Sequence, residues 1–296
     1  MSSLDTPASK HSLVVAGIPL DVYSCANATT ASTPVAVMFL LHGRMGSARK
    51  MEDYVHNIFK DVQGIRRVHL SLDAHDLYIV TFDHRNHGKR MEDKKANMGW
   101  FEEPEKNNER HAIDMYAIQT GTAQDVSYLI DFLPSYLFPH GKRQISQWLC
   151  AGKSLGGHST WLVLRNDPRV KLGIPIIGCP DYLTLISKRA KAHKLPVGPP
   201  YIPDSLLNLI KRADPAASPY TALDDSNPFL GKKVLILAGK DDKTVPWSAG
   251  KTFVETLNVG QHGVKEVIIE EGVGHDFSPA MVKEVARFVW QHALLQ

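Results

Sequence analysis

The segment Cys150-Ala151-Gly152-Lys153-Ser154-Leu155-Gly156-Gly157 decides the fold, because it carries the pattern G-x-S-x-G between two regular elements. The apolar run at residues 147–151 predicts a strand, and the pattern at 155–165 predicts a helix. A sharp turn from strand to helix strains its central serine, and the flanking glycines leave room for the neighbouring elements. The hydroxyl of Ser154 then lies at a helix N-terminus, where the dipole favours a developing anion. We therefore expect Ser154 to be a nucleophile.

Two other interpretations of this turn are weaker. The five-residue pattern also occurs by chance in ordinary glycine turns. Gly152-Lys153-Ser154 is similar to the end of a phosphate-binding P-loop, which requires a glycine five positions before Gly152. Gln147 stands at that position, so the sequence excludes a P-loop.

Short apolar runs alternate with longer helical patterns, which is typical of a mostly parallel sheet with helices on both faces. We expect about eight strands, at residues 12–15, 20–24, 35–41, 78–82, 147–151, 174–178, 234–238 and 266–270. Helical patterns cover residues 48–59, 122–133, 155–165, 249–257 and 279–294. The sequence therefore predicts an α/β fold and a single domain over residues 1–296.

Two segments are too long for ordinary connections in such a fold. Residues 89–110 are polar but include Trp100, and residues 181–230 combine a helical segment with several prolines. We expect residues 181–230 to form a small cap between strands six and seven, and Trp100 and Tyr182 to contact a substrate. The basic residues of the cap helix, Arg189 among them, are expected on a solvated face.

A serine hydroxyl needs a base that takes its proton and an acid that holds the base in one tautomer. An acidic turn with Asp241 and Asp242 follows the predicted strand at 234–238, and a glycine-rich turn with His275 follows the strand at 266–270. An aspartate pair before a helix is often only a cap, and a loop histidine is often only exposed. The candidate nucleophile Ser154 favours a base and an acid at these positions.

Acyl transfer also requires two backbone N–H groups that hold an oxyanion. Leu155 is the expected first donor, because it follows the serine. The strand at 35–41 runs into His42-Gly43-Arg44-Met45-Gly46, whose glycines let the loop turn back over the site. Arg44 is the expected second donor, and His42 is expected to be a structural hydrogen-bonding residue.

Composition and charge indicate a globular protein without an obvious polymeric partner. A net charge of +3, with 43% hydrophobic and 22% charged residues, argues against nucleic-acid binding. The apolar run at 13–20 is too short to span a bilayer, and residues 1–10 do not form a signal peptide. The three cysteines have no CxxC spacing, and the pair His84 and His87 is weak evidence for a metal. We expect a cytoplasmic protein without a metal or an organic cofactor.

With these motifs in register, the chain resembles the α/β-hydrolase superfamily, and within it the prolyl-oligopeptidase-like and dienelactone-hydrolase-like serine esterases. The resemblance extends from His42-Gly43 to His275. The D-x-R-x-x-G turn that begins at Asp83 is similar to the family's turn, in which the acid and the arginine brace the loops. The family pattern G-x-x-D-x-x-V-P selects Asp242 over Asp241.

The resemblance implies an eight-stranded α/β-hydrolase fold and a triad of Ser154, Asp242 and His275. It implies cleavage of a small carboxylic ester or thioester through an acyl-enzyme. Related large peptidases carry a propeller domain, for which 296 residues leave no room. A small peptidase or amidase, a ligand-binding receptor on the same scaffold and a homodimer are left open.

Overall fold

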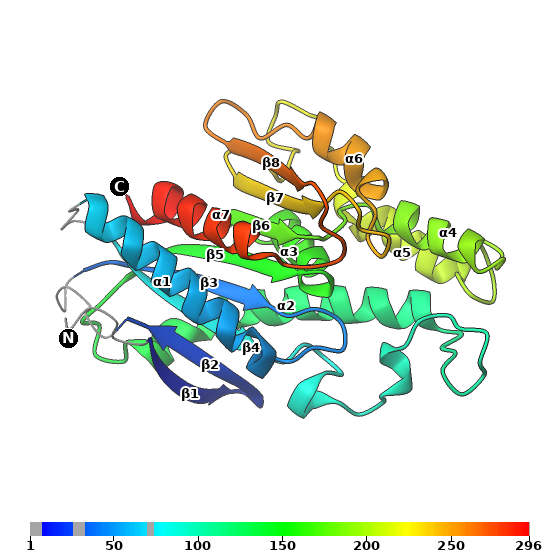
Figure 1. The fold of residues 1–296 in the computed structure, drawn as a ribbon, viewed down its shortest axis with the longest axis horizontal. Coiled ribbons are helices and arrows are strands. Elements are labelled where there is room, and N and C mark those ends of the chain that lie inside the picture. Colours follow the sequence, from blue (N-terminus) through cyan, green and yellow to red (C-terminus); the bar gives the residue numbers. More distant parts are fainter. Residues whose placement is uncertain (1–7, 26–32, 70–73, 296) are drawn as a thin grey trace.

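The computed structural model describes residues 8–25, 33–69 and 74–295 and contains one eight-stranded sheet (Figure 1). The strands follow the order β1-β2-β4-β3-β5-β6-β7-β8. β2 pairs antiparallel with both β1 and β4, and the other neighbours are parallel. The strand bounds are β1 Ser9–Val15, β2 Ile18–Ser24, β3 Val35–Leu41, β4 Asp76–Phe82, β5 Ile145–Lys153, β6 Val170–Ile176, β7 Lys233–Gly239 and β8 Val264–Glu270. The predicted eight-stranded, mostly parallel sheet is confirmed.

Helices cover both faces of the sheet, with α4 and α5 beyond the carboxyl ends of the strands (Figure 1). The helix bounds are α1 Glu52–His69, α2 His111–Leu137, α3 Leu155–Asn166, α4 Tyr182–Ala192, α5 Asp204–Ala213, α6 Trp247–Thr256 and α7 Pro279–Val289. Shorter helical turns lie at Ala48–Met51, Gly88–Arg90, Lys95–Asn97, Pro215–Ala217 and Trp290–Leu294. α4 and α5 form the cap expected between β6 and β7.

The central strand β3 divides the core into two layers. All seven of its residues are buried, as expected for a strand with helices on both faces. Because side chains alternate along a strand, Met38 and Leu40 pack toward α1 and α7, whereas Val37 and Phe39 pack toward α2, α3 and α6. The continuous apolar run of β3 therefore contributes side chains to the core layers on both faces of the sheet.

Four elements differ most from the sequence-based prediction. α1 ends at His69 rather than at residue 59. α2 begins at His111 rather than residue 122, because its first turns bury Met115 and Tyr116 within the cap core. β6 begins at Val170 and ends before Ile177, whose φ of 44° leaves the extended region. α5 is absent from the predicted elements, since prolines precede it.

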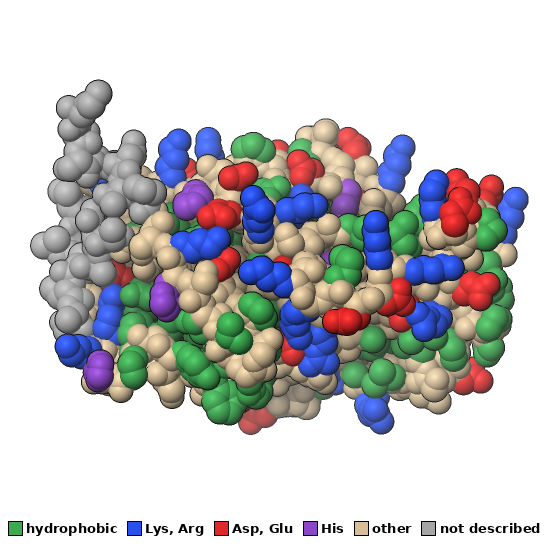
Figure 2. Space-filling view, turned by 90° about the horizontal axis from the view of Figure 1, so that it is seen from below, with side chains coloured by type: hydrophobic (Ala, Val, Ile, Leu, Met, Phe, Trp, Pro, Cys, Tyr) green, Lys and Arg blue, Asp and Glu red, His purple; other side chains and the backbone are tan. Residues whose placement is uncertain are grey.

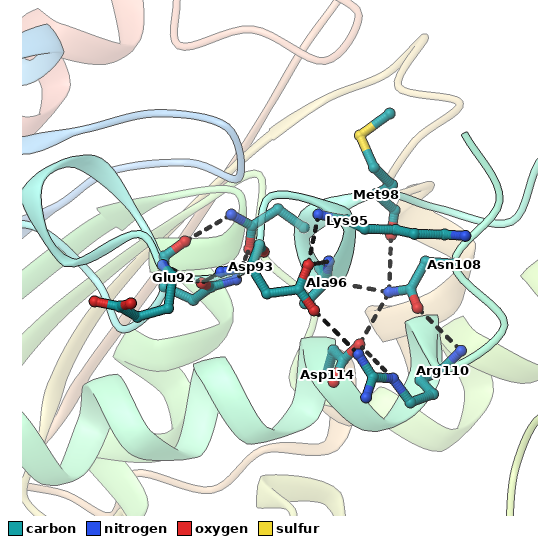
Figure 3. A network of polar contacts seen from close by, with 10 residues as sticks. Glu92, Asp93, Lys95, Ala96, Met98, Asn108, Arg110 and Asp114 are labelled. Carbon is teal, nitrogen blue, oxygen red and sulfur yellow. Dashed lines mark hydrogen bonds and ion pairs between the residues drawn. The ribbon is translucent and has the colours of Figure 1, made fainter. Parts of the chain in front are cut away.

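A polar network holds the 89–110 segment against the start of α2 (Figure 3). The Asn108 side chain donates to the carbonyl of Ala96 over 3.2 Å and to the carboxylate of Asp114 over 3.1 Å. Asn86 accepts from the backbone N–H groups of Glu92 and Asp93. The side chains therefore give this irregular segment a defined backbone path.

The surface carries both signs of charge. On the face drawn in Figure 2, basic and acidic side chains are interspersed, with apolar patches between them. Within the described ranges, no helix combines the length and the apolar character that a membrane span requires.

The tightest backbone approach in the α3 region lies where that helix leaves the sheet. A Cβ atom at Gly152 would lie 2.3 Å from the carbonyl oxygen of Gly156, and one at Gly156 would lie 2.5 Å from that of Leu41. Such distances are far below van der Waals contact, so both positions require glycine. The turn from β5 to α3 therefore depends on glycine at both positions.

Gly156→Ala tests this constraint. The added methyl group meets backbone that cannot move freely, so we expect the free energy of unfolding to fall by about 1–3 kcal/mol. Urea denaturation measures this change. Gly64→Ala on α1 is the matched control, because nothing lies within 4 Å of a Cβ there, and we expect it to be neutral or stabilising by up to ~1 kcal/mol. Wild-type stability of Gly156→Ala contradicts the constraint.

Candidate active site

Ser154 occupies the single residue between β5 and α3. Its φ of 55° and ψ of −111° are unusual for a residue with a side chain. The backbone N–H of Ser154 donates to the carbonyl of Ile176 over 2.8 Å, which fixes the turn against β6. The strained backbone presents the hydroxyl at the carboxyl end of the sheet, directly before a helix N-terminus.

His275 links Ser154 to an aspartate. Its Nε2 lies 2.8 Å from the Ser154 Oγ, and its Nδ1 lies 2.7 Å from an Asp242 carboxylate oxygen. With the imidazole proton on Nδ1, the ring donates to Asp242 and its Nε2 accepts from the hydroxyl. The three side chains come from the ends of β5, β7 and β8, and they lie in the order that proton transfer from the serine requires.

The two adjacent aspartates occupy different environments. The Asp242 side chain is 1% exposed, and its Oδ1 accepts from the backbone N–H groups of Thr244 and Val245 over 2.8 and 2.9 Å. Asp241 is exposed, and its backbone N–H donates to the carbonyl of Val273. Only Asp242 contacts His275, in agreement with the register that the sequence pattern favours.

The loop after β3 turns back over the serine. The N–H of Gly46 donates to the carbonyl of Gly43 over 2.9 Å, and the N–H of Gly156 donates to that of His42 over 3.0 Å. Within the described residues, no acceptor binds the N–H groups of Arg44 or Leu155. Both expected oxyanion donors are thus free of partners among the residues that the structure describes.

His42 supports this loop from below. Its Nε2 accepts from the backbone N–H of His84 over 3.0 Å, and its Nδ1 donates to the carbonyl of Gly43 over 2.8 Å. Burial lowers the pKa of His42 to about 4, so the ring is neutral near pH 7. The rings of His42 and His84 stack with centroids 3.9 Å apart. In the described part of the chain, no group of three or more potential ligands has the arrangement of a metal site.

Asp83 and Arg85 brace neighbouring loops rather than contacting Ser154. The Asp83 carboxylate accepts from the N–H groups of Ala48 and Lys89 over 2.7 and 2.8 Å. The Arg85 guanidinium pairs with Asp125 of α2 at 2.8 Å. These contacts agree with the bracing role that the family resemblance implies.

Lys153, next to the serine, is already neutralised. Its Nζ lies 3.0 Å from the Asp276 carboxylate and 3.3 Å from the Tyr54 hydroxyl. The ammonium also lies 5.5 Å from the centre of the Tyr54 ring. Lys153 therefore braces the loop that carries His275, and the sequence did not indicate this pairing.

Trp100 and Tyr182 lie in the core of the cap, in the same apolar cluster as Leu155. The Tyr182 hydroxyl donates to the carbonyl of Ala112 over 2.6 Å, and the Trp100 indole donates to that of Glu109 over 3.3 Å. Both polar groups are thus occupied. Contact of these two side chains with a substrate stays a prediction.

Arg189 does not share the solvated face expected for the cap helix. It is partly buried, and its Nη2 donates to the carbonyl of Thr244 over 2.9 Å, in the loop that carries Asp242. Arg189 stands three and four residues after the buried Ile186 and Leu185, so helical spacing already places it on the inner face. The sequence analysis missed this inner position because the other basic residues of the helix suggested a solvated face.

No protein-family model matches the chain, and no curated protein matches its sequence. TT1662 from Thermus thermophilus matches in structure with a TM-score of 0.64 and 20% identity, over 97% of this chain and 100% of that one. A 2,6-dihydroxy-pseudo-oxynicotine hydrolase gives 0.55 and 19% identity, over 98% and 68%. The Pyrococcus furiosus esterase Pf2001 gives 0.52 and 17%, over 97% and 94%. The chain therefore has the α/β-hydrolase fold.

Proposed function

We propose that this protein is a serine hydrolase that cleaves a small carboxylic ester or thioester. The carrying observation is the chain of contacts from the Ser154 hydroxyl through the His275 imidazole to the Asp242 carboxylate, at 2.8 and 2.7 Å. These are hydrogen-bond distances for a nucleophile, its base and the group that orients the base. The oxyanion donors and the strained serine support the same chemistry.

In the proposed reaction, the Ser154 Oγ attacks the ester carbonyl while His275 Nε2 takes the hydroxyl proton. The carbonyl electron pair moves onto the oxygen, which accepts from the N–H groups of Arg44 and Leu155. The pair returns as the ester C–O bond breaks, and His275 gives its proton to the leaving alcohol. Water, deprotonated by His275, then hydrolyses the acyl-enzyme and restores Ser154. Asp242 stabilises the imidazolium in both steps.

The structural neighbours include a named esterase and acylaminoacyl peptidases, so their names favour neither class. The ester class is favoured over the amide class because an alcohol leaves more easily than an amine. We place the reaction in the cytoplasm, because the unpaired thiols of Cys25, Cys150 and Cys179 fit a reducing compartment.

A fluorophosphonate probe tests the nucleophile. We expect it to add to Ser154 alone, and Ser154→Ala to remove both the labelling and roughly 10⁴-fold or more of the ester turnover. Mass spectrometry of the labelled peptide and kinetics with an aryl ester measure the two effects. Ser205→Ala, at an exposed serine of the cap, is the control. Full labelling of Ser154→Ala would exclude this assignment.

The adjacent aspartates provide a second, internally matched test. Asp242→Asn keeps the shape but favours the wrong histidine tautomer, so we expect kcat to fall by as much as ~10⁴-fold. Asp241→Asn changes an exposed group and should cost less than about 1 kcal/mol of stability, with little effect on kcat. Both variants are assayed with one ester after circular dichroism shows equal folding. The reverse ranking would assign the orienting role to Asp241.

A further inference from the structure

Two arginines near the proposed nucleophile carry charges that no carboxylate in the described part of the chain pairs. Arg44 lies on the loop after β3, and Arg189 lies on the cap helix α4. Both are partly buried, and neither forms an ion pair within the residues that the structure describes. Partly buried charges without partners are costly, so they indicate a site that gains its partner from outside.

Several other basic side chains near the site have acidic partners. Lys153 pairs with Asp276 at 3.0 Å, and Arg85 and Arg90 share Asp125 at 2.8 Å each. Asp276 and Asp125 therefore offset part of the positive charge of these three side chains. Arg44 and Arg189 have no such partner among the described residues, and they belong to the oxyanion loop and the cap.

The same stretch of backbone connects the two guanidiniums. Arg44 Nη1 donates to the carbonyl of Asn97 over 3.4 Å. The next carbonyl, that of Met98, lies 3.0 Å from His111 Nδ1, and His111 Nε2 lies 3.5 Å from Arg189 Nη1. The polar network in Figure 3 holds this stretch in place. The two arginines thus lie on either side of the same backbone segment, Asn97-Met98, and the His111 ring.

Both guanidiniums keep unused donors. A guanidinium has five N–H groups, and Arg44 uses one of them within the described residues. Arg189 Nη2 donates to Thr244, and its Nη1 lies 3.7 Å from the Met115 sulfur. The remaining guanidinium nitrogens are not fully buried. They are the donors that an incoming ligand would use.

The local electrostatics also favour an anion. Burial, followed by the charge of Arg189, lowers the pKa of Arg44 to about 10, so Arg44 is still protonated near neutral pH. Burial and the two arginines lower the pKa of His111 to about 3, which keeps that ring neutral. Asp242 attracts Arg189, but its oxygens already bind His275, Thr244 and Val245. Binding of an anion relieves the remaining repulsion.

We propose that Arg44 and Arg189 bind a carboxylate of the substrate, so that the ester cleaved at Ser154 is anionic. The inference rests on the proposed function and narrows its substrate class. Two guanidiniums match the planar carboxylate by charge-assisted hydrogen bonds. The carboxylate can belong to the acyl part or to the alcohol part of the ester, and the test separates these two sources.

Each of two substrate pairs compares an anionic ester with a neutral ester of similar shape. Mono-4-nitrophenyl adipate against 4-nitrophenyl 6-methylheptanoate places the charge in the acyl part. 4-Acetoxybenzoate against methyl 4-acetoxybenzoate places it in the alcohol part. We expect the wild-type protein to prefer the anionic ester in one pair by about 10- to 100-fold in kcat/KM. Equal or higher kcat/KM for the neutral ester in both pairs would overturn the proposal without any variant.

Arg189→Leu then tests whether Arg189 causes the preference for the anionic ester. We expect the anionic-to-neutral ratio of kcat/KM to fall by about 10-fold or more, and Arg189→Lys, which keeps the charge without the planar fork, to fall less. Lys191→Leu removes the same charge from the exposed part of α4 and should keep the ratio. If the ratio survives in both Arg189 variants, or falls equally in Lys191→Leu, the arginine pair is not the anion site.

The outcomes also separate this inference from the proposed function. Loss of turnover in Ser154→Ala, together with an unchanged charge preference in the Arg189 variants, refutes the anion site and leaves the hydrolase proposal intact. Full turnover in Ser154→Ala refutes the hydrolase proposal itself, whatever the charge preference.

Discussion

The turn from β5 to α3 depends on an approach of backbone to backbone that only glycine allows. Because Gly152 and Gly156 carry no side chains, α3 starts directly against β3, and the residue between strand and helix is forced to a positive φ. That residue is Ser154. The same closeness lets the N–H of Gly156 bind the carbonyl of His42, so the loop after β3 is joined to the serine turn. This hydrogen bond fixes the position of the candidate oxyanion donors.

The parallel sheet carries the rest of the site. Ser154, Asp242 and His275 are separated by up to 121 residues, yet β5, β7 and β8 end at the same edge of the sheet. Each side chain stands on a short loop between packed elements, which limits its motion. The backbone donors of Thr244 and Val245 then fix the Asp242 carboxylate. Geometry adequate for proton transfer is thus a consequence of strand order and local hydrogen bonds.

The basic side chains around the site fall into two groups, those that pair with carboxylates and those that keep unused hydrogen-bond donors. Lys153, Arg85 and Arg90 find carboxylates within the fold and hold loops together. Arg44 and Arg189 keep donors free where the oxyanion loop meets the cap. Two partly buried guanidiniums that lack a carboxylate partner among the described residues, on the segments that flank the candidate nucleophile, form the electrostatic pattern of an anion-binding site.

The sequence by itself determined the α/β class and the strand-helix turn at Ser154, because these depend on local spacing and on residues with special backbone needs, whereas the choice of Asp242 over Asp241 came from the family resemblance. The eight-stranded sheet could be predicted since each buried strand is a continuous apolar run. Tertiary structure alone decided the early start of α2 and the pairing of Lys153. Each of these depends on contacts between segments far apart in the chain, where packing outweighs local preference. The sequence does not show whether the partner of a lysine or an arginine is water, a carboxylate or a ligand. Only the surroundings of the side chain in the folded protein distinguish these cases.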